Sequence, residues 1–276
     1  MMSYDKYSVL ISLYEKENPD YFLMSINSIL DQSVTPDEII IVLDGKLNDR
    51  LYKIIDYLKS TTSIVKILEL KENIGLGLAL NEGLKVCANN LVARMDTDDI
   101  SDKYRMEKQL KLFSIKKDID IVGSYAAEFL NDETNILSIR SVPILHEDIK
   151  KFSRKRSPFN HPSVMYKKDS IMRIGGYSDL RRNQDVELFG RAMFLGLKGE
   201  NIPESLLLYR INDSLYSRRK SWDNTKTYIH TIKRLWKLGH SSYLDYLIVL
   251  IVQLMLYILP NKVSKLFYSK ILRRQK

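Results

Sequence analysis

Short apolar strands and longer amphipathic segments alternate through the N-terminal part of the chain, and this alternation constrains the fold more than any other feature. Strands are predicted at Tyr7–Leu13, Glu38–Leu43, Ile64–Leu70 and in the apolar run that begins at Leu91. The segments between them have helical spacing of apolar residues, at Asp20–Gln32, Asn48–Lys59 and Leu76–Ala88. This rhythm predicts an α/β fold with a mostly parallel central sheet and helices on both of its faces.

The pattern changes after a helix predicted at Lys103–Lys116. Two strands, Ile119–Phe129 and Ile136–Val142, are joined by a polar turn and are expected to be antiparallel. The rest of the pattern predicts strands at Ser163–Tyr166 and Leu206–Arg210 and helices at Asp169–Ile174, Gln184–Leu197 and Ser221–Leu238. An uncharged apolar segment, Tyr246–Leu259, follows the last of these.

The bulk composition excludes several classes of protein. The chain has 276 residues, a net charge of +9 and a single cysteine, so it has no internal disulfide framework and no thiolate metal cage. Residues Met1–Tyr7 lack the apolar stretch of a signal peptide, which predicts a cytoplasmic location. The basic charge is not accompanied by a nucleic-acid-binding motif, so no nucleic acid partner is expected.

Three carboxylates, Asp96, Asp98 and Asp99, end the strand that begins at Leu91. Like charges this close repel one another, and Mg²⁺ or Mn²⁺ with oxygen ligands would balance them. The alternative is a solvated acidic turn that caps the next helix through Asp99, Ser101 or Asp102. An EF-hand is excluded because Ser101 stands where its glycine belongs.

Polar residues follow the other predicted strands as well. Tyr14, Asp44 and Asn73 stand just beyond three strand ends, as the acidic cluster does beyond the fourth. Ligands of parallel α/β sheets bind beyond the carboxyl ends of the strands. This convergence favours the interpretation of the acidic cluster as part of a ligand site.

The order of these motifs resembles family 2 glycosyltransferases with the GT-A fold, of the kind that builds bacterial capsule, O-antigen and exopolysaccharide. The resemblance spans roughly residues 7–215. It is carried by Ser12-Leu-Tyr14, Asp44-Gly45, Asn73-Ile-Gly75-Leu-Gly77, Asp96-Thr-Asp98-Asp99, His161-Pro-Ser, Gly175-Gly-Tyr177 and Gln184-Asp185-Val-Glu187.

The resemblance implies a nucleotide-sugar site for a UDP-sugar donor. Ser12 and Tyr14 would hold the base, Asp44 would accept from the uracil ring N–H, and Asn73 and Gly75 would let the backbone approach the nucleotide. Relatives often have a second acid where Leu43 stands and an arginine where Leu80 stands.

The resemblance also assigns the chemistry. Asp96 and Asp98 would hold Mg²⁺ or Mn²⁺ at the diphosphate, and Asp99 would orient the loop or touch the donor sugar. Asp185 would be the base of an inverting transfer, preceded by Gln184 where relatives have Glu; as an alternative, an aspartate that opens a helix is a common N-cap. Glu187 is expected to support the site.

Further residues are candidates for the acceptor and the diphosphate. His161 would shape the acceptor pocket or serve as a structural histidine. Arg218 and Arg219 could close over the donor diphosphate, and Arg154–Arg156 could meet an acceptor pyrophosphate; both runs could equally be solvated surface.

The C-terminal segment predicts attachment to a membrane surface. Tyr246–Leu259 is too short for a span, which needs roughly 20 apolar residues. With the basic tail after Pro260 it suits an interfacial helix on the inner leaflet, or else a core helix or dimer face. The expected organisation is a GT-A domain at 1–215, with a nucleotide-sugar half at 1–102 and an acceptor half at 103–215, followed by C-terminal helices at 216–276.

These features predict a metal-dependent inverting glycosyltransferase, peripheral on the cytosolic face of the membrane. It would move a sugar from a UDP-sugar to an undecaprenyl-diphosphate-linked glycan in cell-surface polysaccharide synthesis. A nucleotidyltransferase and a non-catalytic sugar-nucleotide or membrane-binding scaffold are the alternatives.

Overall fold

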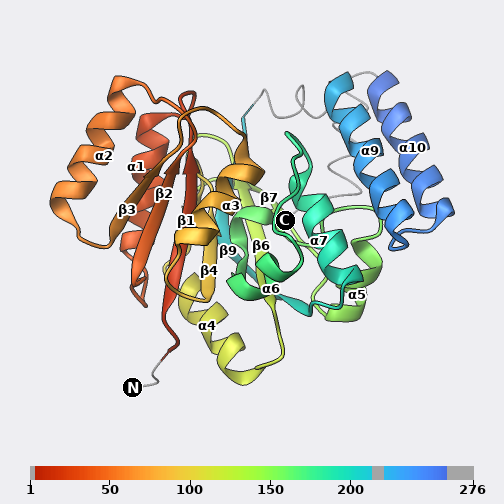
Figure 1. Cartoon of the computed structure of the whole chain (residues 1–276), viewed down its shortest axis with the longest axis horizontal. Coiled ribbons are helices and arrows are strands. Elements are labelled where there is room, and N and C mark those ends of the chain that lie inside the picture. Colours follow the sequence, from red (N-terminus) through yellow and green to blue (C-terminus); the bar gives the residue numbers. More distant parts are fainter. Residues whose placement is uncertain (1–3, 213–220, 260–276) are drawn as a thin grey trace.

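The N-terminal half of the protein is a parallel α/β sheet. The structure is a computed structural model that describes residues 4–212 and 221–259 (Figure 1). Strands β1 (Tyr7–Leu13), β2 (Glu38–Leu43), β3 (Val65–Glu69) and β4 (Leu91–Met95) pair in parallel in the order β3-β2-β1-β4. Helices α1 (Pro19–Leu30), α2 (Asp49–Thr61) and α3 (Leu76–Val86) form the crossovers. The predicted elements of this half are confirmed, with ends that differ by one or two residues.

The sheet continues into a mixed second half. β8 (Met165–Lys167) pairs antiparallel with β4, and β6 (Ile121–Phe129), β9 (Gly199–Arg210) and the short β5 (Ile100–Ser101) follow it across the sheet. β7 (Ile136–Arg140) pairs antiparallel with β6, as predicted. The strands beyond β4 therefore extend the same sheet past the parallel strands.

β9 is longer than the strand predicted at Leu206–Arg210. It begins at Gly199 and pairs in parallel with β6, but the register shifts where Ile202 and Ser205 face consecutive residues of β6. Pro203, which has no N–H to donate, stands inside this irregularity. The proline interrupts the strand pattern in the sequence without ending the strand.

Strand alternation in β1 divides the core between two faces of the sheet. Val9 and Ile11 pack with α1, α2 and α4 (Arg105–Ile115), whereas Leu10 packs with the helices of the other face. Those helices are α3, α5 (His146–Phe152), α6 (Lys168–Arg173) and α7 (Gln184–Phe194). The sequence did not predict α5. Ile149 is its only buried residue and its immediate neighbours are charged, so the segment shows no helical spacing of apolar residues.

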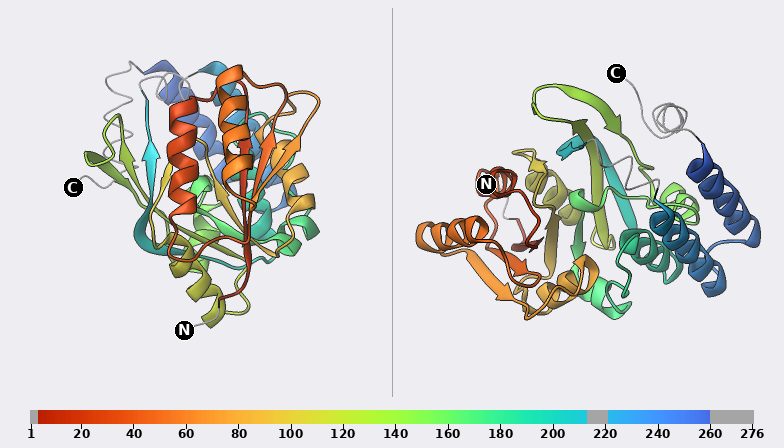
Figure 2. Two further views of the ribbon diagram at one scale, coloured as in Figure 1. Left: turned by 90° about the vertical axis from the view of Figure 1, so that its left-hand side faces the viewer. Right: turned by 90° about the horizontal axis from the view of Figure 1, so that it is seen from above.

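Two C-terminal helices, α9 (Trp222–Leu238) and α10 (Tyr243–Ile258), form an antiparallel hairpin at one end of the molecule, far from α1 and α2 (Figure 2). Val186 of α7 packs with Ile232, Leu235 and Val249 of this hairpin. α10 begins earlier than predicted, because Ser242 and Asp245 form a capping box at its first turn. No helix within residues 4–212 and 221–259 combines the length and hydropathy needed to cross a membrane.

Candidate active site

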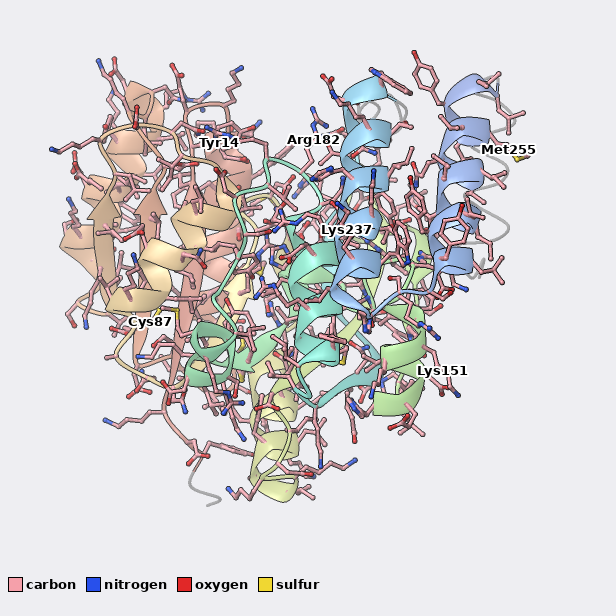
Figure 3. All side chains as sticks on the ribbon, turned by 45° about the vertical axis from the view of Figure 1, so that its right-hand side comes forward. Tyr14, Cys87, Lys151, Arg182, Lys237 and Met255 are labelled. Atoms are coloured by element: carbon pink, nitrogen blue, oxygen red, sulfur yellow. The ribbon has the colours of Figure 1, made fainter. Side chains whose placement is uncertain are left out.

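The polar residues that follow the parallel strands do converge, as the sequence predicted. They line one cavity of about 490 Å³, which we call the rim cavity. Tyr14 and Arg182 lie at this edge of the sheet, on the side that faces α9 (Figure 3). The predicted residues in its wall are Ser12, Tyr14, Asp44, Asn73, Gly75, Asp96 and Asp98.

The loop after β3 is held to the end of β2 by a carboxylate. Asp44 is buried, and its two oxygens accept the backbone N–H groups of Ile74 and Gly75 at 2.7 and 3.0 Å. Gly75 has a φ of +92°, in the left-handed region that favours glycine. A Cβ at this position would also lie 2.8 Å from Nη1 of Arg181. The site therefore needs Asp44 as a loop anchor, in addition to any contact it makes with a ligand.

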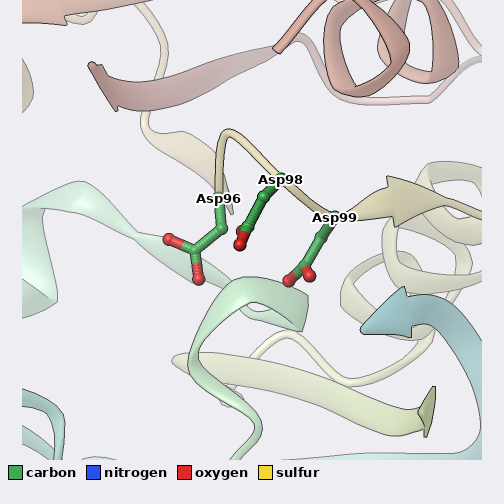
Figure 4. Close-up of side chains that lie close together, drawn as sticks. All are labelled: Asp96, Asp98 and Asp99. Carbon is green, nitrogen blue, oxygen red and sulfur yellow. The ribbon is translucent and has the colours of Figure 1, made fainter. Parts of the chain in front are cut away.

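The acid turn, residues Asp96–Asp99 between β4 and β5, brings three carboxylates together (Figure 4). One oxygen from each lies within 4.8 Å of the others. Asp96 and Asp98 are partly exposed to the rim cavity, whereas Asp99 is fully buried and accepts the backbone N–H of Arg210 at 2.9 Å. Burial and the charge of Asp96 raise the pKa of Asp98 to about 6. Burial, followed by the charge of Asp98, raises the pKa of Asp99 well above its usual range.

A divalent cation fits the acid turn. One oxygen of the buried Asp99 carboxylate has no hydrogen-bond partner within residues 4–212 and 221–259. The raised pKa values of Asp98 and Asp99 show that negative charge in this turn is under-compensated. Clustered carboxylate oxygens are the ligands of Mg²⁺ and Mn²⁺. Of the capping alternatives, only Asp102 accepts a backbone N–H ahead of α4, that of Tyr104, whereas Tyr104 itself stands at the N-cap position of α4. Asp99 accepts the N–H of Arg210 instead, so the three carboxylates of the turn remain candidates for the cation.

Two arginines fix the acid turn from opposite sides. Arg94 on β4 is 1% exposed and forms an ion pair with Asp96. Arg210 at the end of β9 donates from Nε to the carbonyl of Asp98 at 2.9 Å. Its guanidinium also packs on the ring of Tyr21, 3.9 Å from the centroid. Arg94 and Arg210 were not predicted as site residues. The sequence does contain a signal for Arg94. It precedes Asp96 by two positions, and residues two apart in a strand point to the same side.

A second cavity of about 600 Å³ lies between α7 and the C-terminal hairpin, and we call it the hairpin cavity. It shares four lining residues with the rim cavity, so the two spaces adjoin: Leu76, Asp96, Tyr209 and Asn224. Asp185, Gln184 and His161 line it. The predicted acceptor-side residues therefore lie next to the acid turn.

Asp185 lies in the first turn of α7 and is not its N-cap. Asn183 occupies the N-cap position in a left-handed conformation. The interpretation of Asp185 as the N-cap is therefore wrong. Its partly exposed carboxylate takes part in no hydrogen bond or ion pair with the rest of the described chain. The side chain is available to a ligand in the hairpin cavity.

His161 is a buried, neutral wall of the same cavity. Its Nε2 lies 2.7 Å from the hydroxyl of Tyr177, and its ring packs against Phe189 with centroids 5.9 Å apart. Burial and the nearby charge of Arg94 lower the pKa of His161 well below its usual range. The histidine thus both shapes the pocket and belongs to the core beneath it.

Comparison with known proteins identifies the family of this chain. The family model of glycosyl transferase family 2 matches residues 8–180. A UDP-Gal:alpha-D-GlcNAc-diphosphoundecaprenol beta-1,3-galactosyltransferase of Escherichia coli is 35% identical and covers 98% of this chain and 97% of its own length. The chain belongs to glycosyltransferase family 2. The amylovoran biosynthesis glycosyltransferase AmsE of Erwinia amylovora is 32% identical over 96% of this chain and 98% of that protein.

A solved structure supports the fold of this glycosyltransferase. The crystal structure of S. aureus TarS 1-349 in complex with UDP-GlcNAc matches with a TM-score of 0.67 and 16% sequence identity. The match covers 90% of this chain and 71% of that chain. The GT-A fold and the glycosyltransferase class that the sequence indicated are confirmed.

The rim cavity of the glycosyltransferase is lined by basic side chains that the sequence did not predict. Leu80, where relatives often have an arginine, is fully buried in the core under α3. Arg181 and Arg182, just before α7, line the rim cavity instead, and Nη1 of Arg181 donates to the Asn73 side chain at 3.0 Å. Their positive charge suits an anionic ligand at this edge of the sheet.

The support role predicted for Glu187 agrees with its contacts in the glycosyltransferase. Glu187 is buried and pairs with Arg191 at 2.8 Å, and Arg191 donates to the carbonyl oxygen of Gly176 at 2.6 Å. Burial would raise the pKa of Glu187, but the hydrogen bonds from Arg191 outweigh it and lower that pKa. Arg218 and Arg219, predicted to close over the diphosphate, lie outside the described residues.

Proposed function

We propose that this glycosyltransferase moves a sugar from a UDP-sugar to a lipid-linked glycan, with inversion and with Mg²⁺ or Mn²⁺. The observation that carries the proposal is the junction of the two cavities. The rim cavity contains the acid turn, the hairpin cavity contains Asp185, and Asp96 lines both. A donor in one cavity would meet an acceptor in the other at this junction.

The rim cavity would hold the donor. Tyr14 would stack on the base, Asp44 and the Asn73–Gly75 loop would hold the nucleoside, and Arg181 and Arg182 would face the diphosphate. Asp96 and Asp98 would hold the divalent cation, with Asp99 supporting the turn from below. When bound, this cation would neutralise charge that develops on the leaving nucleoside diphosphate.

The hairpin cavity would hold the acceptor, with Asp185 as general base. Its carboxylate would take the proton of the acceptor hydroxyl as that oxygen forms a bond to the anomeric carbon of the donor sugar. The bond between the anomeric carbon and the diphosphate oxygen breaks at the same time, and UDP leaves with the electron pair. Attack from the side opposite to UDP inverts the anomeric configuration.

The acceptor is proposed to be lipid-linked because the similar Escherichia coli enzyme is named for a diphosphoundecaprenol substrate. A second observation supports a location at a membrane surface, and the cytosolic face is our proposal for that surface. The outer face of α10 exposes a row of apolar side chains at helical spacing: Leu244, Ile248, Ile251, Met255 and Ile258. We propose accordingly that residues 216–276 form a membrane-contacting extension of a catalytic domain at 1–215.

The test is release of UDP from a panel of UDP-sugars with Mn²⁺, with and without EDTA. Wild type should release UDP from at least one sugar only when metal is present. Asp185→Ala should abolish release while UDP binding, measured by calorimetry, stays within about twofold, whereas Asp98→Ala should weaken binding about tenfold or more. Equal loss of UDP binding in both variants would contradict the assigned roles. Retention of transfer by Asp185→Ala would exclude it as the base.

A further inference from the structure

The wall of the hairpin cavity contains three kinds of side chain. At the junction with the rim cavity its wall contains the carboxylates of Asp96 and Asp185. The same wall contains basic side chains from β7 and from the loop after α5, and apolar side chains of α10. A ligand that matches this wall would combine a polar group, an anionic group and an apolar chain.

The basic part of the wall runs from the junction toward the start of α10. Arg140 lies with its guanidinium carbon 5.4 Å from the ring centroid of Tyr209, a residue that lines both cavities. It has no carboxylate partner within residues 4–212 and 221–259. Lys155 lies 3.4 Å from Asp245 in the first turn of α10, and Arg156 packs over the ring of Phe152 at 4.7 Å.

The apolar part of the wall is one side of α10. Val249, Val252 and Leu256 line the cavity at helical spacing, and Gln253 is the polar residue of α10 in the same wall. Ile248 belongs both to this cavity wall and to the outer face of α10, where it is 41% exposed. Met255, on the outer face, points away from α9 (Figure 3). The interior apolar wall is therefore continuous with the apolar surface outside.

We propose that the hairpin cavity binds the diphosphate and the first part of the hydrocarbon chain of a lipid-diphosphate-linked acceptor. Arg140, Lys155 and Arg156 contact the diphosphate, and the cavity side of α10 contacts the chain. Such a molecule combines a sugar hydroxyl, a diphosphate and a hydrocarbon chain, and the cavity wall contains a partner for each: Asp185, the basic side chains and the apolar side of α10. Arginine and lysine are well suited to phosphate oxygens.

The statement that this ligand is the acceptor rests on the proposed function. Binding of the ligand can be measured without any transfer of sugar. Phosphate groups of the membrane surface have the same charge. They do not account for an apolar wall inside the same cavity as the basic side chains. A single molecule with both groups does.

Three soluble probes separate the parts of the site: dodecyl diphosphate, methyl diphosphate and dodecyl maltoside, which has a chain but no phosphate. Binding to the full-length protein is measured by calorimetry below the micelle concentration. Each titration is done with and without saturating UDP and Mn²⁺, so that diphosphate binding in the rim cavity is recognised. Dodecyl diphosphate should bind at least about tenfold more tightly than either of the other probes, because it alone contacts both walls.

Matched variants assign each wall. Arg140→Gln should weaken dodecyl diphosphate and methyl diphosphate by about tenfold, with partial recovery in Arg140→Lys, because a charge-assisted hydrogen bond is lost. Lys151→Gln, an exposed lysine on the nearby α5 (Figure 3), should change neither affinity. Val252→Ser should weaken only dodecyl diphosphate, by about threefold or more, since apolar contact is lost. Ile251→Ser, its neighbour on the outer face, should leave that affinity unchanged.

The outcomes are distinct. Equal weakening by Arg140→Gln and Lys151→Gln would show that the diphosphate responds only to net charge and would overturn the site. Equal effects of Val252→Ser and Ile251→Ser would overturn the assignment of the chain to the cavity. If this binding pattern holds while no UDP-sugar is turned over, the proposed function fails and the lipid-diphosphate site stands.

Discussion

At the scale of single residues, the site depends on buried arginine side chains that balance the negative charge of the acid turn. Arg94 is 1% exposed, and two of its guanidinium nitrogens have no hydrogen-bond partner among the described residues, so its ion pair with Asp96 is its main compensation. Without this arginine, three neighbouring carboxylates would face one another, and Asp96 would lose the partner of its ion pair. Breaking a buried pair by removal of one partner costs several kcal/mol.

Arg94→Met should therefore lower the melting temperature of the metal-free protein by on the order of 5 °C or more. Mn²⁺ should recover more of the melting temperature in this variant than it adds to wild type, because the cation then replaces a missing positive charge. Arg50→Met is the matched control, since Arg50 pairs with Asp20 on an exposed surface and should change stability by less than about 1 kcal/mol. An equal Mn²⁺ shift in wild type and Arg94→Met would contradict the role of Arg94.

Gly75 gives a second residue-scale prediction with its own control in the chain. Gly75 and Gly196 have nearly the same φ, +92° and +85°, but a Cβ at Gly196 meets nothing within 4 Å. Alanine at either position should cost about 1–2 kcal/mol of unfolding free energy through the left-handed backbone alone. Only Gly75→Ala should also displace Arg181 from Asn73 and weaken UDP binding. Equal UDP affinity in the two variants, measured by calorimetry, would show that the Arg181 contact does not matter for the nucleotide.

At the scale of elements, the sequence predicted those parts of the fold whose local pattern agrees with their packing. β1 and β2 have the predicted ends because each contains a run of apolar residues flanked by charged or loop residues within one or two positions. β9 and α10 were placed too short, because a proline inside a strand and an aspartate inside a helix look like boundaries. In the structure Pro203 stands at a register shift and Asp245 is the N3 residue of a capping box. These roles depend on partners that a local pattern does not contain.

The same limit applies to the site. Residues after strand ends were predictable because parallel topology brings such positions to one edge. Arg181 and Arg140 were not, because they reach the cavities from segments whose placement depends on the mixed half of the sheet.

One buried histidine joins the C-terminal hairpin to α5 and makes that junction sensitive to acid. Nε2 of His240 lies 2.8 Å from the hydroxyl of Ser153. Burial, followed by the charges of Arg154 and Lys150, lowers the pKa of His240 to about 4, and Asp245 only partly opposes this. In the unfolded chain its pKa is about 6.5. Between these values the unfolded state binds a proton that the folded state does not, so this residue makes stability fall as the pH decreases from about 6.5 to 4.

His240→Gln should flatten that dependence. Wild type should lose melting temperature between pH 7 and pH 5 by more than the variant does, and the two curves should run parallel above pH 7. His230, which is exposed on α9, is the control position: His230→Gln should keep the slope of wild type. The prediction is wrong if the slopes of wild type and His240→Gln agree over the whole range.

At the scale of the whole molecule, the proposed active site and the proposed membrane-contacting face adjoin each other. The acid turn and Asp185 lie where the two halves of the sheet meet, and the α9–α10 hairpin closes the far wall of the hairpin cavity. The outer face of α10 is exposed over most of its length, with Leu244 at 65% and Ile258 at 78%. Because the same helix lines the cavity on its other side, a lipid surface at α10 would place a lipid-linked acceptor next to its site.

The full-length protein should therefore bind vesicles, and more strongly when these contain anionic lipid. The chain after Pro260 adds positive charge without any acid: Lys262, Lys265, Lys270, Arg273, Arg274 and Lys276. Each basic residue near an anionic leaflet is worth about 1 kcal/mol, and this attraction is screened by salt. Co-sedimentation with vesicles of phosphatidylcholine and phosphatidylglycerol should decrease when the salt concentration is raised or when phosphatidylglycerol is omitted.

The apolar part of this contact is tested by Ile251→Glu, with Tyr57→Glu as control. Ile251 is 56% exposed on the outer face of α10, and Tyr57 is 57% exposed on α2 at the opposite end of the molecule. Both substitutions add the same charge at an equally exposed apolar residue, so their difference reports position alone. Ile251→Glu should reduce the vesicle-bound fraction several-fold because it places a charge in the interface, while UDP binding stays unchanged. If both variants lose vesicle binding equally, the contact is set by net charge, and α10 is not the face that meets the membrane.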